Sequence, residues 1–187
     1  MQPYEEAWEA GASFDQFLDA AEHLADLWRS VARRVVADPV SVGRLADSGG
    51  DWRLLVLADD WCGDGLHPLA MAAALAEASP HLELRIVPRD RFPTVRDRHL
   101  TKGARAIPIM IVLDGEGRAH GHWGPRPAPL QAEFELRLKA LPPADRFRES
   151  RRWHVRDQGL TVARELVELI EAVASAGPPE RAVSVGP

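Results

Sequence analysis

The chain has 187 residues but only one cysteine, Cys62, so no disulfide can form within it. Small secreted domains that depend on disulfide frameworks are therefore excluded. The composition, 45% hydrophobic and 27% charged, is ordinary for a globular protein. A chain of this length can bury a sizeable core, so neither disulfides nor a structural metal ion are needed for stability.

A basic excess and long apolar runs are also missing. The formal net charge of −5 argues against a general nucleic-acid binder, and acidic residues interrupt the arginine clusters at 85–98 and 146–156. No apolar run approaches the ~20 residues of a membrane span. The start of the chain has neither the basic end nor the apolar run of a signal peptide. We therefore expect a cytoplasmic protein that binds neither nucleic acid nor membrane.

Three regions are expected along the chain. Residues 1–12, which are polar, small and acidic, predict a flexible arm, and residues 177–187 predict a disordered tail. Between them we expect a single domain over 13–176. Its core should lie at about 50–140, with helical extensions at 13–47 and 145–175.

The first extension carries helix signals. Ser13 and Gln16 fit a capping box, and apolar residues then recur with helical period, which predicts one helix that ends before Pro39. Asp38 can cap a second, short helix that runs to about Ala46.

Short apolar runs that alternate with helical segments predict the sheet. Strands are expected at 53–58, 82–88, 107–114 and 118–124. Helices are expected at 63–78, within 125–141 and at 157–175, and a short helix followed by a loop is expected at 91–104. The proline-rich stretch 142–147 should break the chain. The first two strands should be parallel and the last two an antiparallel hairpin. The pattern predicts an α/β fold, a mixed central sheet with helices on both faces.

Cys62 follows the first strand and begins a helix. Free backbone N–H groups and the helix dipole at that position favour a thiolate and lower the pKa of a thiol. The carboxylates of Asp59, Asp60 and Asp64 oppose this effect. A lone cysteine is otherwise a small apolar residue, so both interpretations stay open at this point.

Three motifs together carry a resemblance: Trp61-Cys62-Gly63-Asp64, the dipeptide Ile107-Pro108, and W-G-P-R-P at 123–127. The chain resembles the thioredoxin superfamily, and more narrowly the bacterial thioredoxin-like proteins whose motif reads W-C-G-D-C or W-C-G-D-S. The resemblance covers about 50–140. It implies a thioredoxin-like three-layer sandwich, here with extra N- and C-terminal helices.

The resemblance also implies roles for particular residues. Cys62 matches the nucleophile, and Pro108 matches the cis-proline whose preceding residue, Ile107, pairs with a substrate chain. The implied substrate groove is lined by Trp61, Gly63, Asp64, Gly65, Ile107 and Pro108. Gly65, however, occupies the position of the resolving cysteine, so the usual dithiol cycle is not available to this chain alone.

Several charged residues could modulate the thiol. Asp59 or Asp60 could replace the buried acid of typical thioredoxins, where Val56 stands here, and His67 could stabilise a thiolate. Arg126 could favour an anionic ligand or pair with a local carboxylate.

Two further histidines are candidate metal ligands. His120 and His122 should face the same way on one strand, but no third ligand follows by spacing. We predict no metal and no cofactor.

Three functions remain open. The first is a monothiol oxidoreductase, in which Cys62 attacks a disulfide or a low-molecular-weight thiol adduct and an external thiol, small or protein-borne, resolves the intermediate. The second is a binding or adaptor module that holds an extended peptide without turnover. The third is a peroxide-sensing single thiol. The terminal amphipathic helices could also form a homodimer surface.

Overall fold

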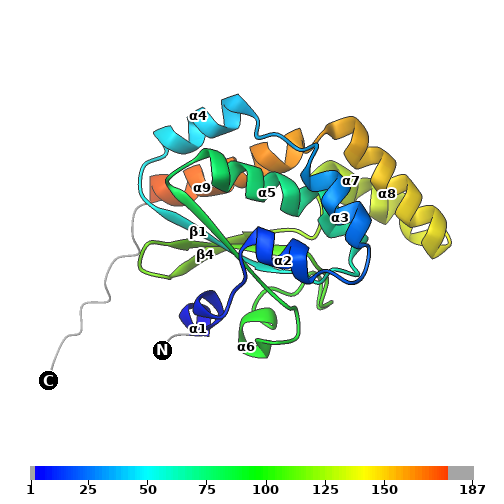
Figure 1. Cartoon of the computed structure of the whole chain (residues 1–187), viewed down its shortest axis with the longest axis horizontal. Coiled ribbons are helices and arrows are strands. Elements are labelled where there is room, and N and C mark those ends of the chain that lie inside the picture. Colours follow the sequence, from blue (N-terminus) through cyan, green and yellow to red (C-terminus); the bar gives the residue numbers. More distant parts are fainter. Residues whose placement is uncertain (1–2, 177–187) are drawn as a thin grey trace, which may run out of the picture.

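The computed structural model describes residues 3–176, and its centre is a four-stranded sheet (Figure 1). The strand order is β2-β1-β3-β4, and the strands are β1 (Trp52–Leu57), β2 (Leu82–Val87), β3 (Ile109–Asp114) and β4 (Ala119–Trp123). β1 and β2 are parallel, whereas β3 runs antiparallel to both β1 and β4. The predicted α/β class, the parallel first pair and the antiparallel hairpin are confirmed.

Helices cover both faces of this sheet. One face carries α1 (Pro3–Glu9) and α6 (Pro93–Arg96). The other carries α2 (Phe14–Ala20), α3 (Ala25–Ala32), α4 (Pro39–Asp47), α5 (Leu66–Ala78) and α9 (Leu160–Ala176). At one end of the molecule stand α7 (Ala128–Leu136), the short 3-10 helix η2 (Leu138–Ala140) and α8 (Pro143–Asp157) (Figure 1). Among residues 3–176, no helix is long and apolar enough to cross a membrane.

The strands alternate their side chains between two cores. Leu54 and Val56 of β1 face the core under α5 and α9, whereas Leu55 and Leu57 face the core under α1 and α6. All four side chains are at most 1% exposed. A strand that is buried on both faces reads as a continuous apolar run, which is why the sequence of β1 was informative.

The expected flexible arm at residues 1–12 is wrong for the part that the structure describes. Residues 3–9 form α1, and Trp8 is only 5% exposed against the sheet. Beyond it, Ala12 pairs with Ile86, with N···O distances of 2.9 and 2.8 Å in the two directions. The segment is polar in composition, but Ala7 and Trp8 are buried in the core on this face and Tyr4 bonds to His99 at 2.9 Å.

The expected single helix from Ser13 is also wrong, because it breaks into α2 and α3. The carboxylate of Asp60 accepts hydrogen bonds from the backbone N–H groups of Glu22 and His23, both at 2.8 Å. Leu24 then adopts a left-handed conformation, with φ of 52°. The capping box at Ser13 and the Asp38 cap of α4 form as predicted.

The proline-rich stretch at 142–147 does not break the chain but begins α8. Pro143 occupies the first turn, where its missing N–H costs nothing. The helix has almost no apolar stripe, so hydrophobic periodicity did not find it. The last helix, expected from residue 157, begins at Leu160 after Gln158 and Gly159, both with positive φ. The predicted tail at 177–187 lies outside the described residues.

Candidate functional site

The thiol lies at the end of β1, where the chain enters a short 3-10 helix, η1 (Gly63–Gly65). Cys62 is partly buried, and its Sγ–H donates a hydrogen bond of 3.4 Å to the carbonyl oxygen of Ile107. The Ile107–Pro108 peptide bond is cis. Trp61 is 48% exposed beside the thiol, and the guanidinium of Arg89 lies 5.2 Å from its ring centroid. The structure therefore brings Trp61, Cys62, Ile107 and Pro108 to one place.

The surroundings of Cys62 favour the neutral thiol. Burial, followed by the negative charge of Asp64, raises its pKa to about 11. The backbone N–H groups of Asp64 and Gly65 and the charge of Arg126 act in the opposite direction, but they are the smaller effects. From the sequence, the backbone N–H groups and the neighbouring carboxylates were expected to shift this pKa in opposite directions. In the structure, burial and the charge of Asp64 are the larger effects, so the pKa is raised.

Helix α8 packs against the loop that carries the thiol. A Cβ placed on Gly63 would lie 1.9 Å from the ring of Phe147, so only glycine fits under that ring. The carboxylate of Asp64 accepts a hydrogen bond of 2.9 Å from Ser150 Oγ and pairs with Arg126. Two of the groove residues that the resemblance implied, Gly63 and Asp64, thus contact α8.

A tryptophan packs against Gly65, which occupies the position of the absent resolving cysteine. Gly65 is buried, and a Cβ there would lie 3.1 Å from the indole ring of Trp28. Trp28 is 0% exposed, and its Nε1–H donates a hydrogen bond of 2.7 Å to the carbonyl oxygen of Asp60. The N-terminal extension therefore fixes the back of the thiol loop.

The carboxyl groups of Asp59 and Asp60, which precede the thiol, lie in different surroundings. Burial raises the pKa of Asp59 against the opposing charge of Arg89. The carboxylate of Asp60 turns away to the N–H groups of Glu22 and His23. Burial alone would raise the pKa of Asp60, but these bonds outweigh it and the pKa is lowered.

The other proposed modulators lie apart from the thiol or are already paired. His67 stacks on His154, with ring centroids 5.2 Å apart, and burial lowers its pKa to about 4. It is therefore neutral at pH 7 and has no charge with which to stabilise a thiolate. Arg126 pairs with Asp64 and lies 3.8 Å from the ring centroid of Phe134, so its charge is used within the fold.

The two histidines of β4 do not face the same way, contrary to the expectation. A register shift in the β3–β4 pair turns the strand between them. His120 bonds to Asp114 at 2.8 Å, whereas His122 contacts His99 at 3.1 Å beside α6. Within residues 3–176, no cluster of three or more His, Cys, Asp or Glu side chains could hold a metal ion.

A family model described as thioredoxin matches residues 11–140, more than half of the chain. The chain belongs to the thioredoxin family. Two solved structures share its fold. One is a protein of unknown function from Pseudomonas aeruginosa, 22% identical with a TM-score of 0.69, and the alignment covers 92% of this chain and 99% of that one. The other is an HIV epitope-scaffold, 22% identical with a TM-score of 0.64, and the alignment covers 90% and 98%.

No curated protein matches this member of the thioredoxin family. At 22% identity the two solved structures show the fold alone. Their coverage nevertheless reaches beyond residues 50–140, so the flanking helices belong to the shared fold. Thioredoxin superfamily membership and the thioredoxin-like sandwich with extra terminal helices are confirmed.

Sequence reasoning missed the residues that close this thioredoxin site. Phe147 lies in the stretch that was expected to break the chain, Ser150 lies in the C-terminal extension without an expected role, and Trp28 is one of several apolar residues on a helical stripe. The only sequence signal was glycine at positions 63 and 65, which indicates close approach of another group without naming it.

Replacing Gly63 with alanine should destabilise the protein by about 1–3 kcal/mol, the usual cost of overpacking. The added Cβ would overlap the ring of Phe147, so the ring has to move. Chemical denaturation would measure the change. Gly43→Ala is the matched control, because Gly43 is helical and a Cβ there meets nothing within 4 Å. Equal stability of the two variants would contradict the packing described here.

Proposed function

We propose that this thioredoxin-family chain is a peptide-binding module, in which Trp61, Ile107 and Pro108 hold an extended chain while Cys62 stays protonated. The observation that carries the proposal is the covering of the thiol loop by α8, through Phe147 on Gly63 and Ser150 on Asp64. A loop fixed in this way supports stable binding more than the exchange of covalent partners.

The state of the thiol supports the same function. With a pKa of about 11, only about one thiol in ten thousand is ionised at pH 7, and the thiolate is the nucleophile. The bond from Sγ–H to the carbonyl oxygen of Ile107 requires the protonated form. Gly65 provides no second sulfur to release a mixed disulfide.

Two residues of the implied groove, Ile107 and Trp61, support the binding of an extended chain. Ile107 lies outside the paired register of β3, which begins at Ile109 on the β1 side and at Met110 on the β4 side. Its backbone therefore lies beyond the β3 ladder, where the family resemblance implies that a substrate chain pairs through main-chain hydrogen bonds. The half-exposed ring of Trp61 offers an apolar anchor next to it.

Binding of a permanently unfolded protein tests this proposal. The probe is reduced, carboxymethylated α-lactalbumin carrying a fluorescent label, which has no free thiol and cannot be captured covalently. Anisotropy should report binding to the chain and to Cys62→Ser with affinities within about twofold of each other. Trp61→Ala should weaken binding by about tenfold or more, the size of an aromatic hot spot.

Leu136→Ala is the matched control for the probe experiment, because Leu136 is 89% exposed on α7. It should bind as the unmodified chain does. Absence of binding by the unmodified chain, or equal binding by Trp61→Ala, would overturn the proposal.

The monothiol oxidoreductase is the second candidate, favoured by the N–H groups of Asp64 and Gly65 and the charge of Arg126, which all act to stabilise a thiolate. Its required partner is an external thiol, small or protein-borne. The rate of Cys62 alkylation by iodoacetamide against pH, read by intact mass, separates the two candidates.

For the binding module we expect the alkylation rate to rise up to about pH 11. At pH 7 it should be roughly 10- to 30-fold slower than for a cysteine in a short peptide, since lower ionisation is partly offset by the greater nucleophilicity of a more basic thiolate. An inflection below the ordinary thiol pKa of ~8.5 would instead establish the reactive thiol that the oxidoreductase needs.

A further inference from the structure

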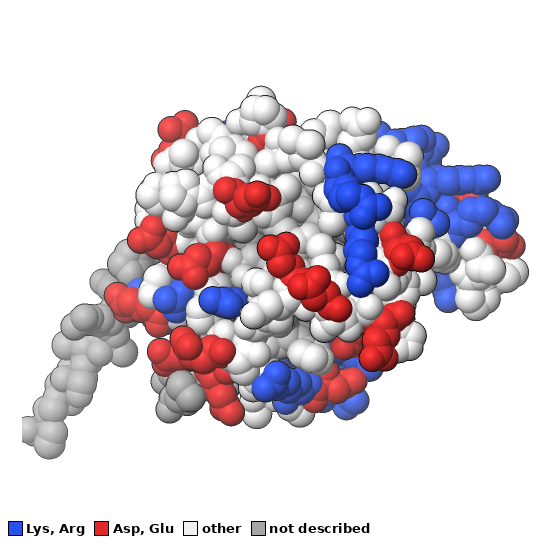
Figure 2. Space-filling view, viewed as in Figure 1, with Lys and Arg blue, Asp and Glu red and all other residues white. Residues whose placement is uncertain are grey.

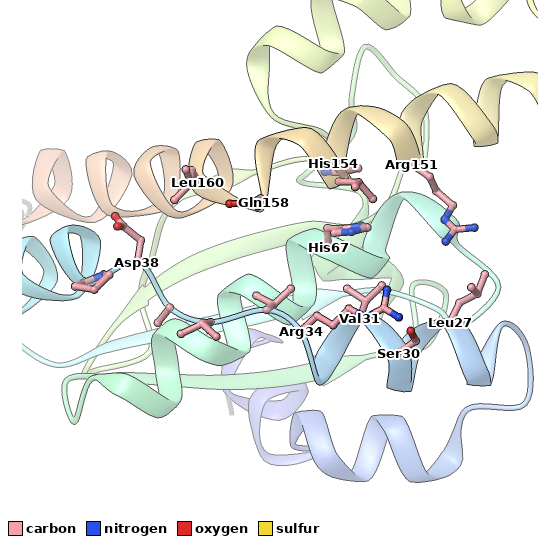
Figure 3. A pocket seen from close by; sticks show the side chains of 15 residues that line it. Leu27, Ser30, Val31, Arg34, Asp38, His67, Arg151, His154, Gln158 and Leu160 are labelled. Carbon is pink, nitrogen blue, oxygen red and sulfur yellow. The ribbon is translucent and has the colours of Figure 1, made fainter.

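A cavity of about 520 Å³ lies between α3, α5 and α8, and Cys62 is not among the residues that line it. Figure 3 shows His154 and Arg151 of α8 facing His67 of α5, with Leu27, Val31 and Arg34 on the opposite side. Its size is within the range of small-molecule sites, roughly 300–1,000 Å³. Neither the thiol nor the groove beside it contributes to the lining.

The inner wall of this cavity carries polar atoms without partners. Both ring nitrogens of His154 and Nδ1 of His67 are buried and form no hydrogen bond. His154 is 1% exposed and His67 8% exposed. Buried polar groups are almost always hydrogen-bonded, so unpartnered ones at a cavity wall point to a polar ligand group. Because burial keeps both rings neutral at pH 7, each can donate one N–H.

The charges around the cavity select for an anion. Nε of Arg151 is buried there without a partner, and Arg34 is exposed on the facing wall. Of the described residues that line the cavity, Asp38 alone is acidic, and its carboxylate already accepts bonds from Ser41 N and Oγ at 2.9 and 2.7 Å. Figure 2 shows Lys and Arg gathered over the end of the molecule that α8 forms, which would attract an anionic ligand.

The rim of the cavity is apolar and open to solvent. Val36 is 80% exposed, Val155 60% and Leu160 51%, and all three line the cavity. Val36 follows α3, whereas Val155 and Leu160 lie at the junction of α8 and α9, so the fold brings two distant parts of the chain together at one site. Such a patch around a polar interior is typical of a ligand-binding site.

We propose that this cavity binds an amphipathic monocarboxylate, a molecule with one carboxylate and an aliphatic body. The carboxylate is held by Arg34 and Arg151 and reaches the imidazole wall, while the aliphatic body covers Val36, Val155 and Leu160. The inference goes beyond the proposed peptide-binding function and does not depend on it, because the two sites share no residue.

Calorimetric titration of the full chain at pH 7 tests this site, with decanoate as the probe and decanol as its uncharged counterpart. Decanoate should bind at least tenfold more tightly than decanol. Arg151→Gln and Arg34→Gln should each weaken decanoate binding about tenfold, the size of one charge-assisted hydrogen bond. The control is Arg152→Gln, on the same helix but outside the cavity, where its partner is Glu149 at 2.7 Å.

Three results would overturn the proposal: no binding of decanoate, equal binding of decanoate and decanol, or equal weakening by Arg152→Gln and Arg151→Gln. Trp61→Ala should leave decanoate affinity unchanged. Failure here is therefore distinguishable from failure of peptide binding at the thiol loop, which is measured with a different probe and depends on Trp61.

Discussion

Replacing Trp28 with alanine should lower the free energy of unfolding by about 3–5 kcal/mol, the usual cost of removing a large aromatic side chain from a core. The indole is 0% exposed and lies edge-on to Phe17, with ring centroids 5.0 Å apart. It also packs on Gly65, and its N–H is bonded to Asp60 O. The substitution therefore removes apolar contact, an aromatic pair and a hydrogen bond together.

The same substitution should expose the thiol loop. Cys62 alkylation at a fixed pH should be faster in Trp28→Ala, because the wall behind Gly65 is lost.

Trp28→Phe keeps most of the apolar contact but leaves Asp60 O without its donor, so we expect a smaller loss of about 1–3 kcal/mol. Trp61→Ala is the matched control, since that tryptophan is 48% exposed. A Trp28→Ala variant as stable as Trp61→Ala would contradict the packing of α3 on this loop.

Lowering the pH from about 6.5 toward 4 should destabilise the protein by several kcal/mol. Burial, then the neighbouring His67 and Arg126, lowers the pKa of His154 to about 3. Burial, then Arg151, lowers the pKa of His67 to about 4, although Asp157 acts in the opposite direction. In the unfolded chain both histidines titrate near ~6.5.

The sign follows from proton binding. Between pH 6.5 and 4 the unfolded state holds more protons on these two residues than the folded state, so the free energy of unfolding falls as the pH falls. Each histidine contributes a slope of up to about 1.4 kcal/mol per pH unit. Above pH 6.5 both states bind the same number of protons at these positions, and the contribution is constant. Asp114, whose pKa is lowered to about 2, adds to the loss mainly below about pH 4.

Urea denaturation at pH 7 and pH 4.5 would measure this effect. His154→Phe keeps a flat ring against His67 but cannot be protonated, so the loss of stability between the two pH values should shrink. Part of the loss should remain, because His67 and His99, whose pKa values are both lowered to about 4, still titrate. The control His81→Gln, at an exposed ring, should keep the full loss. An unchanged loss in His154→Phe would contradict the buried, neutral state of that histidine.

The elements that could be predicted from the sequence are those that depend on local patterns of residues. Residues 54–58 are apolar throughout because β1 is covered on both faces, and the Ser13 and Asp38 caps are local hydrogen-bond motifs. The elements that were predicted wrongly depend on contacts between residues that are far apart in the sequence. Nothing near residues 20–24 indicates that the Asp60 carboxylate will take the N–H groups of Glu22 and His23.

The same distinction applies to the candidate site, where some contacts could be predicted from motifs and others could not. The motif at Trp61–Asp64 and the Ile107-Pro108 dipeptide were enough to predict that Cys62 and Ile107 meet, because a family resemblance carries that contact. The side chains that pack on the thiol loop, Trp28, Phe147 and Ser150, come from outside those motifs. Helix α8 is charged along most of its length, so the pattern that identifies buried helices is absent from it.

Helix α8, which packs on the thiol loop, is synthesised well after the loop itself. Cys62 and its loop are made long before Phe147 and Ser150, and Ser150 follows Asp64 by 86 residues. A nascent chain that has folded its first strands on the ribosome therefore carries this cysteine without the helix that later packs over it. Until residues 147–150 have emerged, the thiol loop lacks its contacts with Phe147 and Ser150.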